Sequence, residues 1–141
     1  MTDTEAEAFI TYLPHSRELG MEVISILDGV AELRLPYDTR LIGNPATGVL
    51  AGGAVSTLMD TCGGAAVMSH PDTSGPTATL DLRIDYMRSA TPGQAIVARA
   101  ECYHVTRHVA FVRATAFDDD SSRPVAAANG AFTVARLSKK K

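Results

Sequence analysis

A carboxylate and a glycine-rich helix start, eight residues apart, are the groups in this chain best suited to do chemistry. The segment 43–67 reads GNPATGVLAGGAVSTLMDTCGGAAV and carries one acid, Asp60, after Gly52 and Gly53. The first-turn N–H groups of a helix that starts at Gly52 have no partner within it and carry partial positive charge. Glycine lets a ligand approach them closely. The pattern predicts backbone donors for an anionic group and an acid, Asp60, kept accessible two turns further on.

The helix face that bears Asp60 is made of small residues. At about 100° per residue one stripe contains Gly53, Ser56, Asp60, Gly63, Gly64 and Val67, with Thr57 at its border. The opposite face contains Val55, Leu58, Cys62 and Ala65 and is expected to pack on a core. Glycine inside a helix costs about 1 kcal/mol relative to alanine. The adjacent glycines therefore indicate a packing or ligand role for the small-residue stripe.

Size and composition predict one domain spanning residues 1–141, without repeats or a linker. The chain has 45% hydrophobic residues and a net charge of −3, which gives no general electrostatic reason to bind nucleic acid or an anionic membrane. It contains no run of about 18 apolar residues. Its first ten residues, MTDTEAEAFI, are acidic, whereas a secretory signal begins with basic residues. These features predict a cytoplasmic protein.

The two cysteines and the basic end give no further site. Cys62 and Cys102 match no metal-ligand spacing, so we expect reduced thiols, with Cys62 in the core, and no metal. Residues 138–141 are expected to form a flexible, solvated basic tail.

The elements that must position the site are expected to follow one another in a simple order along the chain. A capping box at 4–7 predicts a short helix from about Glu5 to Leu13, within residues 1–14, that Pro14 ends. Asp28-Gly29 between two apolar runs predicts a hairpin from about 20 to 35, followed by an irregular segment to Leu50. The long helix closes at His70-Pro71. Four strands joined by turns are expected after it: 77–86, 95–105, 109–118 and 124–137. This order predicts an α+β fold with one curved antiparallel sheet wrapped around a central long helix.

This order and these residues resemble the hotdog-fold acyl-CoA thioesterases of the phenylacetate-degradation (PaaI-like) type. The family pattern is an Asn in the loop, a His-Gly-Gly helix start, an acid in the helix and a strand ending in Tyr-(Leu/Met)-Arg-x-Ala-x-x-Gly. The matching residues here are Asn44, Ala51-Gly52-Gly53, Asp60 and the run 86–93, YMRSATPG. The resemblance covers about residues 20 to 134. Ala51 stands where the family usually has His.

The resemblance implies hydrolysis of a thioester. Asp60 is expected to be the general base that activates water or the nucleophile that forms a mixed anhydride. The Gly52 N–H, with that of Gly53, is expected to hold the oxyanion. Asn44 would orient the water or bind the carbonyl, and Thr79 would position the water from the opposite subunit. By default, Asn44 is a turn residue and Thr79 a strand former.

The resemblance also implies the partners. Arg88 and Arg107 are candidates to bind the CoA phosphates, although surface charge is the default role of each. Ala51 leaves space for a water or a bulkier acyl group. The substrate is expected to be a short-chain, medium-chain or aryl acyl-CoA, with coenzyme A as part of the substrate and no further cofactor. A homodimer or a dimer of dimers (a homotetramer) is expected, with the site at the dimer interface.

Two alternatives stay open on the same fold. Because Ala51 replaces a polar residue, the chain is alternatively a non-catalytic acyl-CoA or acyl-carrier binding module. A hydratase ranks last, because Asp60 has no His nearby in sequence. The acyl preference depends on the loops 36–50 and 72–76.

Overall fold

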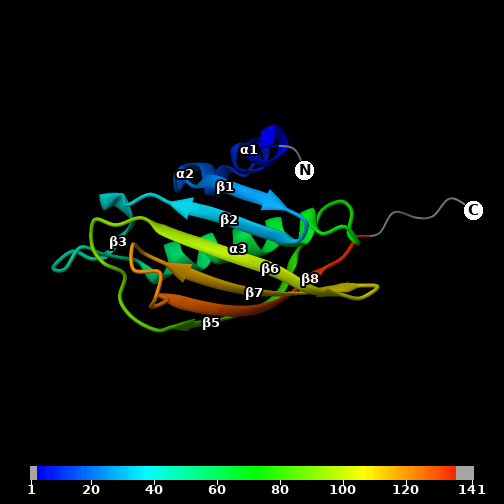
Figure 1. Cartoon of the computed structure of the whole chain (residues 1–141). Coiled ribbons are helices and arrows are strands. Elements are labelled where there is room, and N and C mark those ends of the chain that lie inside the picture. Colours follow the sequence, from blue (N-terminus) through cyan, green and yellow to red (C-terminus); the bar gives the residue numbers. More distant parts are fainter. Residues whose placement is uncertain (1–2, 136–141) are drawn as a thin grey trace, which may run out of the picture.

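The computed structural model describes residues 3–135, in which a six-stranded antiparallel sheet curves around one long helix (Figure 1). The strand order is β1-β2-β6-β7-β8-β5. The strands of this sheet are β1 (Glu22–Leu27), β2 (Val30–Leu35), β5 (Thr79–Tyr86), β6 (Ile96–Val105), β7 (Val109–Phe117) and β8 (Ala126–Thr133). The long helix is α3 (Gly52–Ser69). The predicted α+β class and the sheet wrapped around a central helix are confirmed.

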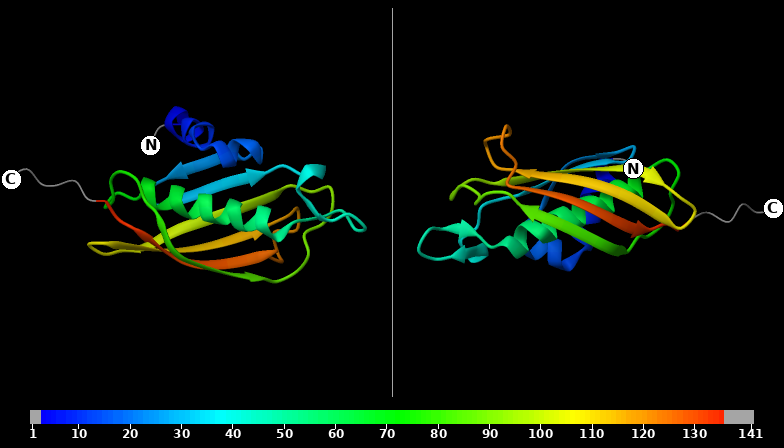
Figure 2. Two further views of the ribbon diagram at one scale, coloured as in Figure 1. Left: turned by 180° about the vertical axis from the view of Figure 1, so that it is seen from behind. Right: turned by 90° about the horizontal axis from the view of Figure 1, so that it is seen from below.

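Helix α3 crosses the concave face of the sheet, as the view from behind shows (Figure 2, left). Its predicted apolar face is buried: Val55, Leu58, Cys62 and Ala65 are at most 3% exposed. They pack in one core with residues of the inner sheet face, among them Leu33, Leu35, Ile96 and Phe132. Alternation along the strands and the helical period of α3 thus direct apolar side chains into the same layer.

The N-terminal region differs from the single short helix that we predict. Helix α1 (Asp3–Tyr12) is followed at once by a second helix, α2 (Pro14–Glu18). Pro14 begins α2 because the missing N–H of proline costs nothing in a first helical turn. Leu13 before it is extended, at φ −87° and ψ 105°. The side chains of Thr4 and Glu7, which would form the capping box, and the basic tail at 138–141 lie outside what the structure describes.

The predicted hairpin is confirmed, and the segment after it is more ordered than expected. Asp28 and Gly29 both have positive φ, 49° and 84°, as a two-residue turn of type I′ requires. Segment 36–50 contains a 3₁₀ turn (Thr39–Leu41) and a small hairpin of β3 (Ile42–Asn44) and β4 (Val49–Leu50). This hairpin leads the chain into the start of α3.

Strand β5 lies at the edge of the sheet and pairs only with β8. Apolar and polar residues alternate along β5, and the apolar Leu82 and Ile84 pack on the core. A bulge between Thr79 and Asp81 interrupts the register, and Leu80 is 58% exposed. Tyr86 at the other end is 53% exposed. The free edge of β5 therefore carries both unpaired backbone groups and large apolar side chains.

The small-residue stripe of α3 is buried at Gly63, Gly64 and Val67 and more accessible at Gly53, Ser56 and Asp60. A Cβ atom on Gly63 would lie 2.8 Å from Cζ of Phe132, so Gly63 makes room for that ring. Of the two roles that the adjacent glycines indicate, packing within the chain is the one seen at Gly63 and Val67, which are buried. A Cβ on Gly64 would meet nothing closer than 3.8 Å. Gly53 has no atom within 4 Å of that position.

Candidate functional site

Asp60 and Thr79 come together from different elements. Asp60 is half-buried on α3, and Thr79 is the first residue of β5. The Thr79 hydroxyl donates a hydrogen bond of 2.6 Å to Oδ1 of Asp60. Both residues line a hollow of about 450 Å³, whose other lining residues are His15, Ser56, Thr57, Leu82 and Ile84. The threonine thus orients the carboxylate toward open space.

The start of α3 presents backbone donors. Ala51 is the N-cap, with an extended backbone (φ −59°, ψ 136°) and no capping side chain. Its own N–H donates to the Leu41 carbonyl at 2.8 Å. Among residues 3–135, no acceptor receives a hydrogen bond from the N–H of Gly52 or Gly53. These first-turn donors are available to a ligand oxygen.

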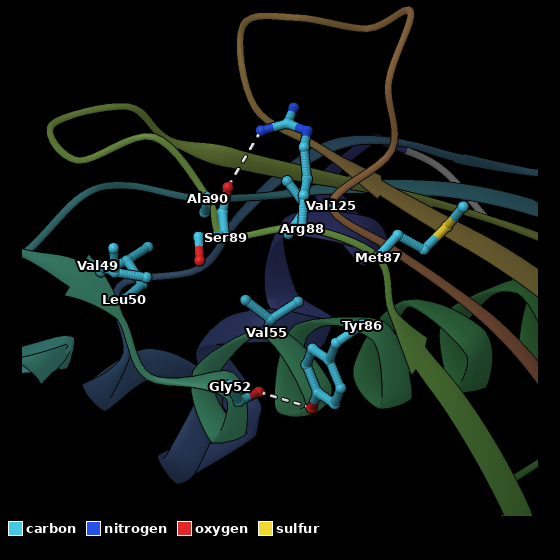
Figure 3. Close-up of a pocket in the computed structure, with 10 residues that line it drawn as sticks. All are labelled: Val49, Leu50, Gly52, Val55, Tyr86, Met87, Arg88, Ser89, Ala90 and Val125. Atoms are coloured by element: carbon cyan, nitrogen blue, oxygen red, sulfur yellow. Dashed lines mark hydrogen bonds between the residues drawn. The ribbon is translucent and has the colours of Figure 1, made fainter.

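Tyr86 fixes the glycine start, a role that the sequence alone does not assign to it. Its hydroxyl donates to the Gly52 carbonyl at 2.9 Å, as Figure 3 shows. A Cβ on Gly52 would lie 3.4 Å from the Tyr86 ring. Tyr86 is the last residue of β5, and its side chain reaches the helix start. The contact between the end of β5 and the start of α3 is a tertiary contact, which only the folded structure reveals.

The helix start opens on a different hollow from the one beside Asp60. This hollow, about 370 Å³, is lined by Val49, Leu50, Gly52, Val55, Tyr86, Met87, Arg88, Ser89, Ala90 and Val125 (Figure 3). An α-helix rises 1.5 Å per residue, which places Gly52 and Asp60 about 12 Å apart along the axis. Hydrogen bonds reach only about 3 Å. One copy of the chain therefore does not aim both groups at the same atom.

Arg88 holds a buried acid. Its guanidinium donates to both carboxylate oxygens of Asp118, at 2.7 and 2.6 Å, and also to the Arg123 carbonyl. The Asp118 side chain is fully buried and accepts further bonds from Thr91. The Arg88 guanidinium holds the pKa of Asp118 well below its usual range. This fork anchors the 88–91 and 118–123 loops to each other, and the geometry argues against its use for phosphate.

The Arg88–Asp118 pair is expected to contribute to stability in a pH-dependent way. Asp118→Asn should lower the free energy of unfolding by about 2 kcal/mol at pH 7, because the amide cannot accept both guanidinium bonds. The lowered pKa of Asp118 gives stability that is complete above the unfolded value, about 4, and is lost as the pH falls below it. Urea unfolding at pH 7 and pH 3 should therefore show a gap between variant and wild type that narrows in acid. Asp119→Asn, an exposed neighbour, is the control, and equal stability of both variants would contradict this role.

The other predicted residues lie further from these groups. Asn44 is a turn residue: its Oδ1 accepts from the Ala46 N–H at 3.0 Å, and it lines none of the hollows described. Arg107 lies in the β6–β7 turn, at the end of the sheet away from the start of α3 (Figure 1). Ala51 and Gly53 line a third hollow of about 330 Å³ with His15. Sequence reasoning missed His15 of α2, which lines one hollow together with Asp60 and another together with Gly53.

The two cysteines line none of the hollows described above. Both cysteines are free and buried, and burial raises the pKa of the Cys62 thiol to about 12. Its thiol lies 3.2 Å from the Ala31 carbonyl in the core, as predicted. Residues 3–135 contain no cluster of three or more His, Cys, Asp or Glu suited to a metal ion. None of the helices in this described range is long and apolar enough to cross a membrane.

Comparison with known proteins gives consistent matches over most of the chain. The family model of the thioesterase superfamily matches residues 47–125, which include α3, Asp60 and Thr79. The medium/long-chain acyl-CoA thioesterase YigI of Escherichia coli is 28% identical over 120 residues, 76% of this chain and 77% of that protein.

Solved structures agree with the sequence matches. A crystal structure of a Pseudomonas aeruginosa protein superposes with a TM-score of 0.83 and 42% identity, covering 94% of this chain and 98% of that one. The phenylacetic acid degradation protein PaaI of Thermus thermophilus, solved as a point mutant, gives a TM-score of 0.76 at 25% identity over 89% of this chain and 100% of that one. The chain therefore belongs to the thioesterase superfamily and is a thioester hydrolase on the hotdog fold.

Proposed function

We propose that this protein hydrolyses acyl-CoA thioesters to the free acid and coenzyme A, at a site built by two copies of the chain. The observation that carries the proposal is the hydrogen bond between Thr79 and Asp60, the acid of α3. At the start of the same helix, the N–H of Gly52 has no acceptor among residues 3–135. YigI, a related protein, acts on acyl-CoA by its name. No cofactor beyond the substrate's own CoA is needed.

Two copies are needed because the carboxylate of Asp60 and the N–H of Gly52 lie too far apart within one copy to act on the same substrate atom. In one copy, Asp60 with Thr79 forms one half of the site, and Gly52 with Tyr86 forms the other. A twofold axis passing close to Ser56, midway between Gly52 and Asp60, reverses the direction of α3 in the second copy. It thereby brings the Gly52 half of one copy beside the Asp60 half of the other.

The free edge of β5 supplies the surface for such a dimer. An edge strand offers unpaired N–H and C=O groups to another strand. Leu80, Tyr86 and Met87 at this edge are each more than half exposed. Antiparallel pairing of two β5 strands would cover these side chains and align the two α3 helices in opposite directions. Two such dimers could then stack as a tetramer.

The chemistry follows from these placements. Acting as a general base, Asp60 takes a proton from a water whose oxygen attacks the acyl carbon, while Thr79 orients the carboxylate. The partner's Gly52 N–H, with that of Gly53, stabilises the negative oxygen of the tetrahedral intermediate. Breaking the C–S bond releases CoA, whose sulfur takes the proton back. Acting as a nucleophile, Asp60 would instead form a mixed anhydride that water then hydrolyses.

A binding module without turnover is the second candidate, favoured by the N-cap Ala51 that brings no polar side chain to the helix start. The experiment that separates the two is an assay of purified protein with acetyl-, butanoyl-, decanoyl- and phenylacetyl-CoA, following release of free thiol. Turnover that scales with protein concentration supports the hydrolase. Saturable binding of acyl-CoA by calorimetry, with no thiol released, would contradict it and favour the binding module.

A further inference from the structure

A second groove adjoins Asp60 on the side away from the helix start. It runs along α3 between helix α1 and the start of β5, and its volume is about 330 Å³. Its lining residues are Phe9, Tyr12, Leu13, Asp60, Thr61, Gly64, Met68, Pro76, Thr77, Thr79 and Phe132. Asp60 and Thr79 therefore line both this groove and the hollow beside Ser56.

We propose that this groove holds the acyl chain of a medium-chain substrate and that Gly64 sets the chain length. The proposal rests on the proposed function, because it needs the reacting carbonyl to lie at Asp60. It assigns a specificity-determining role to a residue whose only other interpretation is structural.

The groove has the polarity that an acyl chain requires. Away from the Asp60–Thr79 end, its walls are mainly aromatic and aliphatic, with Phe9, Leu13 and Met68 along the path. The Thr77 hydroxyl is turned away, since it donates to the Thr133 carbonyl at 2.6 Å. Burying a methylene chain against such a surface removes apolar area from water. A charged or strongly hydrated acyl group would lose its hydration there without compensation.

The length of the groove indicates a medium chain. Along α3 it extends from Asp60 to Met68, eight residues, or about 12 Å at the helical rise. Carbon–carbon bonds of about 1.5 Å advance about 1.25 Å each in an extended zigzag, so roughly ten carbons cover that distance. The acyl chain would therefore reach Met68 only if nothing projects from the helix between the two residues.

Gly64 is the residue at that midpoint, and the fold does not require it to be glycine. A Cβ there would lie 3.8 Å from Thr77 and 4.0 Å from Phe132, ordinary contact distances. Its neighbour Gly63 is different, because its Cβ would lie 2.8 Å from Phe132. Glycine is unfavourable inside a helix, so a position where alanine fits without strain gains nothing in stability from glycine. Gly64 is buried and lines the groove, so a side chain at this position would take up part of the groove's volume.

The test is the ratio of kcat/KM for decanoyl-CoA to that for butanoyl-CoA in a graded series, Gly64→Ala and Gly64→Val. The ratio should fall at least about 10-fold in Gly64→Val, with Gly64→Ala in between, because filling an apolar pocket by a methylene changes selection by about this factor. Met68→Ala lengthens the groove and should shift the ratio the other way. Ser89→Val, which fills the hollow beside Gly52 instead, should leave the ratio unchanged.

The outcomes separate this inference from the proposed function. Butanoyl-CoA turnover and the urea midpoint verify that each variant is folded. An unchanged ratio in folded Gly64→Val overturns the inference while hydrolysis itself persists, and a ratio that responds to Ser89→Val places the chain in the other hollow. Absence of any hydrolysis by the wild type overturns the proposed function. The same ratio, taken from dissociation constants of the two acyl-CoAs by calorimetry, then still decides whether Gly64 sets chain length.

Discussion

Replacing Asp60 with asparagine should lower kcat for acyl-CoA hydrolysis by about 100-fold or more, the range expected for losing a general base. Asparagine has nearly the same shape and still accepts the hydrogen bond that Thr79 donates in the wild type. It lacks the negative charge that removes a proton or attacks a carbonyl carbon. Steady-state release of free thiol, with substrate concentration varied, measures the effect, and KM should change much less than kcat.

Thr79→Val is the matched comparison for that experiment. It keeps the β-branched shape on β5 but removes the hydroxyl that orients the carboxylate, so a smaller loss of about 10-fold is expected. In this variant the Asp60 carboxylate keeps its negative charge but is no longer held in one orientation by the threonine hydroxyl. If Asp60→Asn retains wild-type kcat while folded, the carboxylate has no part in the reaction and the account of the site is wrong.

Gly52→Pro should lower kcat by about 100- to 1,000-fold, as removal of an oxyanion donor does elsewhere. Proline deletes the backbone N–H without removing a bond of the helix, because the first helical position has no intrahelical acceptor for it. Ala51 already has the extended backbone, ψ 136°, that a residue before proline adopts. The change therefore isolates one hydrogen-bond donor.

The control is Gly52→Ala, which keeps the N–H and adds only a methyl group. That methyl would lie 3.4 Å from the Tyr86 ring, a close contact that the partly exposed ring can relieve. We expect Gly52→Ala to stay within about 10-fold of the wild type, so that loss in the proline variant reports the donor. Equal losses in both variants would mean that side-chain volume at position 52 matters and the N–H does not.

Local patterns were enough to predict the long helix and the strands of the main sheet, but not α2 or the β3–β4 hairpin. The Asp28-Gly29 turn, the period of α3 and the alternation of β5 each determine an element from neighbouring residues. The resemblance to PaaI-like proteins implies that Thr79 positions the water from the opposite subunit, whereas the fold places its hydroxyl on Asp60 of the same chain.

What local patterns miss are contacts between residues distant in sequence. The sequence suggests that Arg88 is a surface cation, but its guanidinium is hydrogen-bonded to Asp118, thirty residues later in the chain. Gly63 and Gly64 fall in the same stripe of small residues, and only the position of Phe132 separates the glycine where a Cβ would clash from the one where it would fit. The sequence predicts that the loop 72–76 influences acyl preference, and the proposed groove is lined by Pro76 of this loop but also by Phe9 and Tyr12 of α1. The position of α1 on the rest of the fold cannot be predicted from the periodicity of its own sequence.

Subunit mixing tests the central claim, that Asp60 and the Gly52 N–H act on one substrate from different copies. Asp60→Asn and Gly52→Pro proteins, each nearly inactive, are mixed under conditions that exchange subunits, with sedimentation confirming a dimer or tetramer before and after. Half of the exchanged dimers then carry one of each chain, and one of their two sites is complete, so activity should return to about a quarter of the wild-type value. A mixture that exchanges subunits and stays as inactive as its components would contradict the shared site.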